Sequence, residues 1–170
     1  VQHRLVAYEK SGKADGYRLT TLGYDFLALH ALGDALASLG SQIGVGKESD
    51  VYLGLDYQGR EVVVKFHRLG RTSFRKVKEK RDYHGKRRSP NWLYLSRLAA
   101  TREAAFMQAL FSQDPPLPVP EPLGHNRHVL VMSLVPVTPL ERVAEVPDVP
   151  GLFSALNDLI LRLGNLGLIH

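Results

Sequence analysis

Two glycines and a lysine are the residues of this chain whose types and spacing could do chemistry. Gly44 and Gly46 lie in a short turn, and Lys65 follows the apolar run Val62 to Val64. Glycine has no Cβ, so the backbone of such a turn can pass close to a polyphosphate that a side chain would block. A buried strand holds its last residue at a fixed depth, where a lysine can bind phosphates. This spacing predicts a nucleotide triphosphate clamp on a β-hairpin.

Two other phosphate-binding motifs share part of this pattern, and the sequence excludes both. A P-loop requires a glycine five residues before Gly46 and a Ser or Thr after the lysine, but Ser41 and Glu48 occupy those places. A dinucleotide-binding turn requires a third glycine at Ser49 and a helix directly after it, whereas an apolar strand follows here.

The protein-kinase pattern fits better. G-x-G-x-x-G-x-V matches Gly44, Gly46 and Val51, with Ser49 in place of the last glycine, and V-A-I-K matches residues 62–65. A plain β-hairpin with a glycine-rich turn is the alternative for this segment taken alone, because G-x-G by itself is a weak signal.

The elements that must position these residues follow from turn residues and apolar spacing. Residues 3–9 and 16–20 flank a glycine-containing turn, which predicts a hairpin. Thr20 or Thr21 is expected to cap a helix with an apolar stripe that ends at Gly40. A second helix is expected from Ser89-Pro90, with Trp92, Leu95, Leu98, Ala99, Phe106, Met107 and Leu110 on one face, and a third from Asp148 or Val149. Strands are expected at 41–46, 50–56, 60–66, 121–124 and 128–134.

Several separated stretches then resemble one known family. They are Asp15 to Thr20, Leu22 to Leu29, Gly46 to Tyr52, Leu69 to Arg75, Lys80 to His84 and Trp92 to Leu98. In this order and spacing they resemble the RIO family of atypical protein kinases, and within it the eukaryotic form of the Rio two subfamily. The resemblance covers essentially the whole chain.

The resemblance implies an α+β fold, in which a protein-kinase-like amino-terminal lobe has an antiparallel sheet and a regulatory helix. Residues 1–39 would end a winged-helix domain with its wing hairpin and linker helix. Residues 40–135 would form the lobe, with a flexible basic loop at 67–90. Residues 136–170 would leave the hinge and start the carboxy-terminal lobe.

The family also implies which residues contact ATP. We expect Glu103 of the second helix to pair with Lys65 and hold it against the α- and β-phosphates, with an ordinary surface acid as the alternative. Met132 would guard the back of the adenine pocket, and the Ser133 carbonyl and Val135 amide would bind adenine. The expected nucleotide contacts are Gly44, Val45, Gly46, Lys47, Glu48, Ser49, Val51, Val63, Lys65, Met132, Ser133 and Val135.

In this family, Gly-Leu-Ile-His is followed directly by the loop that carries the catalytic aspartate. The chain ends with that sequence at His170, so we expect it to be truncated at both ends and inactive alone. The main ligands of the Mg²⁺ that accompanies ATP would lie outside it. The seven histidines are scattered, without cysteine, and no metal site is predicted within the chain.

Charge is concentrated in one segment. Residues 67–90 hold ten Lys or Arg and two acids, a balance of +8, whereas the whole chain has a net charge of +5 and its remainder is therefore −3. Such a segment is typical of a polyanion-binding loop, with a solvated loop of like charges as the alternative. The interleaved aromatic residues favour RNA. The expected RNA contacts are Arg71, Arg75, Lys76, Lys78, Lys80 and Arg81.

Together these features predict an ATP-binding serine/threonine kinase or ATPase that acts in small ribosomal subunit maturation. Its partners would be the pre-small-subunit ribosome, its rRNA and assembly factors, with no membrane and no required homo-oligomer, in the cytoplasm with shuttling through the nucleus. An RNA-docking winged-helix scaffold, for which nucleotide is only a conformational ligand, is the alternative. A small-molecule phosphotransferase is disfavoured by the basic segment and the wing.

Overall fold

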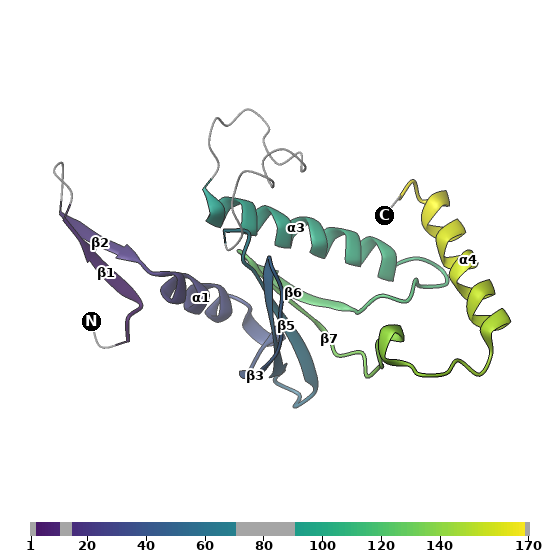
Figure 1. The fold of residues 1–170 in the computed structure, drawn as a ribbon. Coiled ribbons are helices and arrows are strands. Elements are labelled where there is room, and N and C mark those ends of the chain that lie inside the picture. The colour runs from purple at the N-terminus through teal and green to yellow at the C-terminus, as the bar shows by residue number, and fades with distance from the viewer. Residues whose placement is uncertain (1–2, 11–14, 71–90, 169–170) are drawn as a thin grey trace. The chain divides into compact units, whose positions relative to one another are not determined.

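The computed structural model describes residues 3–10, 15–70 and 91–168. The chain divides into two compact units, Val1–Leu134 and Val135–His170. The first holds a hairpin, a helix and a five-stranded sheet with a long helix, and the second holds one helix. Figure 1 labels these elements along the chain.

The amino-terminal hairpin is present as predicted, although β1 starts three residues later than expected, and the helix after it begins where it was predicted. Strand β1 (Val6–Glu9) pairs with β2 (Gly16–Leu19) in antiparallel register. Helix α1 (Thr21–His30) is capped by Thr20, whose hydroxyl accepts a hydrogen bond of 3.0 Å from the Gly23 amide. A threonine at this position satisfies one of the free amides of the first turn. The assignment of the hairpin to a winged-helix domain stays a prediction.

The helix expected to reach Gly40 ends at His30, so that prediction was wrong. Gly33 has φ of +58° and begins the short 3-10 turn η1 (Gly33–Ala35), after which β3 starts at Ser38. A left-handed residue cannot continue an α-helix, and glycine adopts this conformation at little cost. The apolar residues beyond it belong to the sheet, since Leu36 packs against its core.

The sheet is antiparallel, as predicted. Its strands lie in the order β3-β4-β5-β7-β6, and the bounds differ from the expected ones by up to three residues. The strands are β3 (Ser38–Val45), β4 (Ser49–Leu55), β5 (Glu61–His67), β6 (Pro122–Asn126) and β7 (Val129–Ser133).

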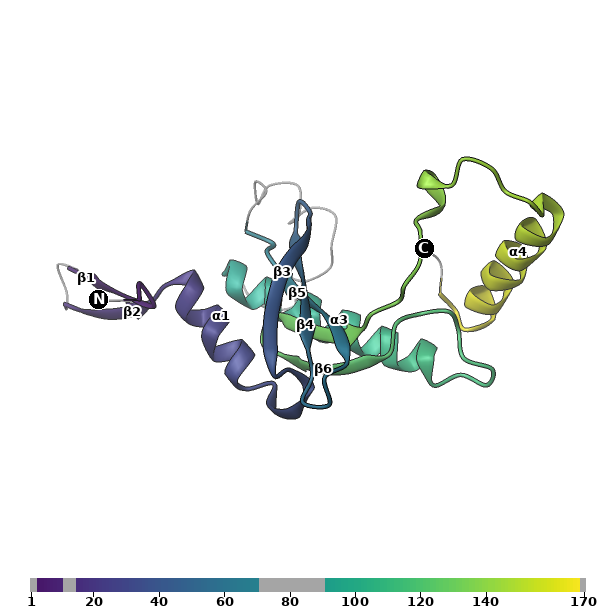
Figure 2. The ribbon, with the colours of Figure 1, turned by 90° about the horizontal axis from the view of Figure 1, so that it is seen from below.

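The two faces of the sheet have different roles. Side chains of a strand alternate between faces, so Val62, Val64 and Phe66 of β5 point to one face while Val63, Lys65 and His67 point to the other. Helix α1 covers the first face and α3 (Trp92–Phe111) the second, and Figure 2 shows them on opposite sides of the strands. The core on the α1 side consists of Ala28, Leu32, Val62, Val64, Phe66, Val129 and Val131.

Helix α3 begins at Trp92, two residues after Pro90. Asn91 caps it by accepting a hydrogen bond of 3.0 Å from the Leu93 amide. Its buried residues are Leu95, Ser96, Ala99 and Ala100. Phe106, expected on the packed face, is 52% exposed. It lies on the same stripe as Ala99, but the small core cluster that Ala99 forms with Leu69 and Leu95 does not include it.

The second unit contains η2 (Leu140–Arg142) and α4 (Val149–Asn165). Asp148 caps α4 through a hydrogen bond of 2.9 Å that its carboxylate accepts from the Gly151 amide, in agreement with the expected start. No residue of α4 is buried. Among the described residues, none of the helices has the length and apolar character needed to span a membrane.

Candidate nucleotide-binding site

Lys65 and Glu103 meet between the sheet and α3. The Lys65 Nζ donates to Glu103 Oε1 at 2.7 Å and to Oε2 at 2.9 Å. Their side chains are 26% and 29% exposed, respectively. The predicted ion pair is therefore present, and its lysine is anchored while remaining within reach of solvent and of a ligand.

A second basic residue, which the sequence analysis missed, contacts the same carboxylate. His67 Nε2 lies 3.2 Å from Glu103 Oε2 and its side chain is buried. Among the described residues, this nitrogen makes no well-aligned hydrogen bond, so the carboxylate of Glu103 is its nearest acceptor. The available signal was the two-residue alternation of β5, which places Lys65 and His67 on one face. Because His67 also borders the basic run, it was predicted to belong to the flexible loop 67–90.

Two opposing effects set the charge of Glu103. Burial raises the pKa of Glu103, but its contacts with His67 and Lys65 lower it by more, to about 2. Opposite charges nearby favour the ionised form of an acid. Glu103 is therefore a carboxylate throughout the neutral range, and it holds the Lys65 ammonium by charge as well as by hydrogen bonds.

The glycine turn connects β3 to β4, and β4 pairs in turn with β5, the strand that carries Lys65. The Gly46 amide donates to the Ser49 carbonyl at 2.7 Å and closes the turn. The register pairs Gly44 with Val51 and Val51 with Lys65. Directly opposed residues share a face of the sheet, so Val51 lies beside Lys65. Lys47, at the tip of the turn between β3 and β4, is exposed.

The packing of the protein itself does not require a glycine at position 44. A Cβ there would meet Val51 Cβ at 3.6 Å, an ordinary contact, and the φ of Gly44 is not positive. Gly54, in contrast, has no room, because a Cβ would lie 2.7 Å from Leu36 Cδ1 and 2.9 Å from the Ser38 carbonyl oxygen. The absence of a side chain at Gly44 is thus consistent with a ligand that approaches the backbone closely at this position.

The residues expected around adenine lie at the end of β7. Met132 is opposite Val63 in the register and is buried. The Ser133 hydroxyl accepts a hydrogen bond of 2.9 Å from the Glu121 amide, and the Ser133 amide donates to the Glu121 carbonyl. The serine side chain therefore has a structural role within the lobe. Val135 is the first residue of the second unit, and its contact with adenine stays a prediction.

The start of the basic segment differs from the prediction of a flexible loop at 67–90. His67 ends β5, Leu69 is 1% exposed, and the Arg68 amide donates to the Glu48 carbonyl at 2.6 Å. Residues 67–69 are therefore part of the lobe, because the Leu69 side chain is buried there and the backbone amides of His67 and Arg68 are hydrogen-bonded there. The expected RNA contacts Arg71, Arg75, Lys76, Lys78, Lys80 and Arg81 lie outside the described residues.

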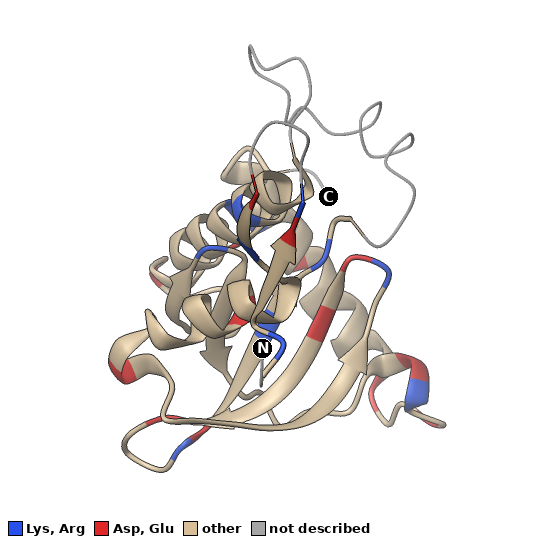
Figure 3. Ribbon diagram, turned by 90° about the vertical axis from the view of Figure 1, so that its left-hand side faces the viewer, with Lys and Arg blue, Asp and Glu red and all other residues tan. Residues whose placement is uncertain are grey.

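The described part of the chain has no single charged face in the view of Figure 3, where basic and acidic residues are interspersed. Within residues 3–10, 15–70 and 91–168, no group of three or more His, Cys, Asp or Glu side chains could hold a metal ion.

Comparison with known proteins identifies the family. The family model of the RIO domain matches residues 50–170. The chain is 54% identical to serine/threonine-protein kinase RIO2 of Caenorhabditis elegans, over 99% of this chain and 32% of that protein. It is 48% identical to the Schizosaccharomyces pombe kinase rio2, over 99% of this chain and 49% of that protein.

Solved structures agree with the sequence relatives. The crystal structure of the Rio2 kinase from Chaetomium thermophilum superimposes with a TM-score of 0.76 at 52% identity, covering 94% of this chain and 47% of that one. The ADP/Mg²⁺-phosphoaspartate complex of the Chaetomium thermophilum Rio2 kinase gives 0.78 at 51% identity, covering 95% and 47%. These matches confirm the predicted α+β, kinase-like fold.

The chain spans about a third to a half of the length of the relatives it matches. Over that length the glycine turn, the Lys65–Glu103 pair and the antiparallel sheet occur together. The chain belongs to the RIO domain family, and it is similar to the Rio2 kinases over nearly all of its residues.

Proposed function

We propose that this chain is the nucleotide clamp of a RIO-type serine/threonine kinase or ATPase that binds ATP with Mg²⁺. The observation that carries the proposal is the Lys65–Glu103 ion pair beside a glycine turn. In that turn the packing of the protein would tolerate a side chain at position 44, so the glycine is explained by the close approach of a ligand. Relatives named as kinases, one of them solved with ADP and Mg²⁺, support it.

The residues of the clamp would act by positioning. A lysine ammonium has three N–H donors, and Glu103 engages two of them, so one remains for a phosphate oxygen. Backbone amides around Gly44 to Glu48, other than the Gly46 amide that closes the turn, would bind the polyphosphate where no side chain intervenes, with the Ser49 hydroxyl near the phosphates. ATP supplies the phosphoryl group, and holding it in one place is the contribution of these residues to the reaction.

Replacing Lys65 with alanine in the full chain tests the proposal. We expect MgADP affinity, measured by calorimetry, to fall by about tenfold or more because a charged hydrogen bond is lost. The lobe should stay folded, since His67 still faces Glu103. Lys10→Ala, an exposed lysine of the hairpin region, is the control. Unchanged affinity and turnover in the Lys65 variant would overturn the proposal.

We further propose that the whole protein acts in maturation of the small ribosomal subunit, with the pre-ribosome, its rRNA and assembly factors as partners. ATP hydrolysis would time its release, in the cytoplasm and with shuttling through the nucleus. The support is the resemblance to this family and the +8 balance of residues 67–90, which suits a polyanionic partner. Cosedimentation of the tagged full-length protein with pre-small-subunit particles tests it, and its absence from those particles contradicts it.

A second candidate function is an RNA-docking module in which nucleotide is only a conformational ligand. Exposed Tyr8 and Tyr17 on the hairpin favour it, with ring centroids 5.2 Å apart, because exposed aromatic rings can stack with bases. Turnover separates the two functions. Hydrolysis that depends on Lys65 supports the enzyme, whereas nucleotide binding without turnover in the full-length protein supports the module.

A further inference from the structure

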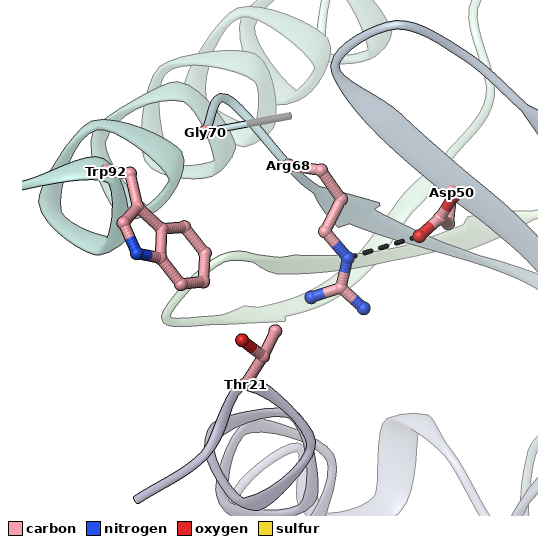
Figure 4. Close-up of a pocket in the computed structure, with 5 residues that line it drawn as sticks. All are labelled: Thr21, Asp50, Arg68, Gly70 and Trp92. Atoms are coloured by element: carbon pink, nitrogen blue, oxygen red, sulfur yellow. Dashed lines mark hydrogen bonds and ion pairs between the residues drawn. The ribbon is translucent and has the colours of Figure 1, made fainter. Parts of the chain in front are cut away.

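Arg68, directly after β5, links three elements through its guanidinium. Its Nη1 and Nη2 donate to the two carboxylate oxygens of Asp25 on α1, at 2.7 and 2.8 Å. Its Nε donates to Asp50 Oδ2 on β4, at 3.1 Å. Figure 4 shows the Arg68 side chain directed from the end of β5 toward Asp50, with Thr21 of α1 nearby. None of the three charged side chains is more than 13% exposed.

Further contacts hold Asp25 on the sheet. His128 Nε2 lies 2.7 Å from Asp25 Oδ1, and the His128 ring stacks on Tyr24 of α1 with centroids 4.9 Å apart. Burial raises the pKa of Asp25, but contacts with His128 and Arg68 lower it by more. A buried charge that loses its partner is costly, so α1 and Arg68 are expected to keep their places together.

The same arginine also contacts the glycine turn. Its backbone amide donates to the Glu48 carbonyl at 2.6 Å. Its side chain holds Asp50, the residue that follows Ser49, where the turn is closed by the Gly46 amide. Arg68 therefore fixes the returning side of the turn at two points. A movement of Asp25 would therefore displace the glycine turn through Arg68, which contacts both.

We propose that Asp25 and Arg68 are positioning residues through which the docking of α1 sets the conformation of the glycine turn and, with it, the affinity for nucleotide phosphates. The inference rests on the proposed nucleotide site. Because such coupling is reciprocal, bound nucleotide also stabilises the docked α1. The effect concerns phosphates and not adenine, since Arg68 contacts the turn and has no contact with β7 residues 132–133 among its hydrogen bonds.

Asp25→Asn in the full chain tests the proposal, because it removes the charge and nearly preserves the volume. We expect the Kd for MgADP to rise by about tenfold, within the range of roughly 5- to 150-fold that is usual for coupled sites. The Kd for adenosine, which has no phosphates, should change by less than about twofold, which is the usual limit for the effect of one site on another that is not coupled to it.

Asp56→Asn is the matched control. Asp56 is 5% exposed, against 8% for Asp25, and it pairs with Arg60 at 2.7 Å in the turn between β4 and β5. It has no contact with the glycine turn among its hydrogen bonds, so MgADP binding should not change. An equal loss for MgADP in this variant, or an equal loss for adenosine in Asp25→Asn, would overturn the proposal.

Hydrogen exchange of the wild-type chain gives a second measurement that no folding defect can affect. MgADP should slow exchange of the α1 amides around Asp25, and unchanged exchange there would overturn the inference. The two proposals fail differently. If MgADP does not bind in a Lys65-dependent manner, the nucleotide site fails, whereas normal binding by a folded Asp25→Asn variant removes only the coupling.

Discussion

At the scale of single residues, Glu103 determines how the lobe responds to acid, because two basic side chains share it. Its pKa in the folded state, about 2, lies below the ordinary 4.5. A lowered pKa contributes stability that is complete above pH 4.5 and is lost as the pH falls toward 2. The gap corresponds to on the order of 3 kcal/mol.

Urea unfolding of wild type and Glu103→Gln from pH 7 downward measures this contribution. The wild type should be more stable at neutral pH, and its advantage should shrink steadily once the pH falls through the range between 4.5 and about 2. An advantage that is constant with pH would mean that the carboxylate charge does not stabilise the lobe.

His67 should account for part of the low pKa of Glu103. Replacing it with asparagine removes one basic neighbour and leaves Lys65 at 2.7 Å. We therefore expect the pKa of Glu103 to rise above its wild-type value and to stay below 4.5, as measured by NMR titration of its side-chain carboxyl carbon. His125→Asn on β6 is the control. An unchanged pKa in the His67 variant would show that Lys65 alone lowers it.

Two glycines of the same sheet should separate binding from folding. Gly44→Ala meets only an ordinary contact, at 3.6 Å from Val51, so its stability should stay within about 0.5 kcal/mol of wild type while MgADP binds less tightly. Gly54→Ala meets the Ser38 carbonyl at 2.9 Å and should lose about 1–3 kcal/mol through overpacking. Thermal unfolding with and without MgADP measures both, and normal MgADP affinity in Gly44→Ala would contradict the expected close approach.

At the scale of elements, Gly33 ends α1 and lets the chain turn into β3. A Cβ there would meet no atom within 4 Å, so the cost of Gly33→Ala is conformational only. The φ of +58° predicts a loss of about 1–2 kcal/mol in unfolding free energy. Gly16→Ala, also in open space but without a positive φ, should be close to neutral. Equal effects of the two substitutions on urea unfolding would contradict this explanation.

The elements also show what local patterns could predict. The caps at Thr20 and Asp148, the antiparallel strands and the Lys65–Glu103 pair follow from turn chemistry, alternation and motif spacing, all of which act over short stretches or through a known pattern. The end of α1 was missed because the helical spacing of apolar residues continues past Gly33, whereas the positive φ of Gly33 prevents the helix itself from continuing.

The network around Arg68 could not be predicted in the same way. Its partners Asp25, Asp50 and His128 are separated from it by 18 to 60 residues along the chain. Charge alone does not tell whether an arginine in a basic run is paired, because that depends on which elements pack together. Arg68 was therefore counted with the basic residues of the 67–90 segment, although the structure places it in the lobe.

At the scale of the whole molecule, the pairing of Arg68 removes one of the ten basic residues of the 67–90 segment from those that could meet RNA. With Arg68 paired to Asp25 and Asp50, the basic residues proposed to meet RNA are those between 71 and 90, beginning with Arg71. Each phosphate contact releases condensed counterions, so the dependence of binding on salt reports the number of contacts.

If about five basic residues contact phosphates, the log-log slope of RNA affinity against salt should be roughly −3.5 to −4.5. Replacing Arg71, Arg75, Lys76 and Lys78 with alanine should flatten that slope by roughly 3, with MgADP affinity unchanged because Gly44 and Lys65 are intact. A wing variant, with Arg4, Lys10 and Arg18 replaced by alanine, is the comparison, and filter binding to an rRNA fragment over a salt series measures all three proteins. A slope that changes only in the wing variant would move RNA docking to the hairpin and leave residues 71–90 as a solvated segment, since charges that meet no phosphate release no counterions.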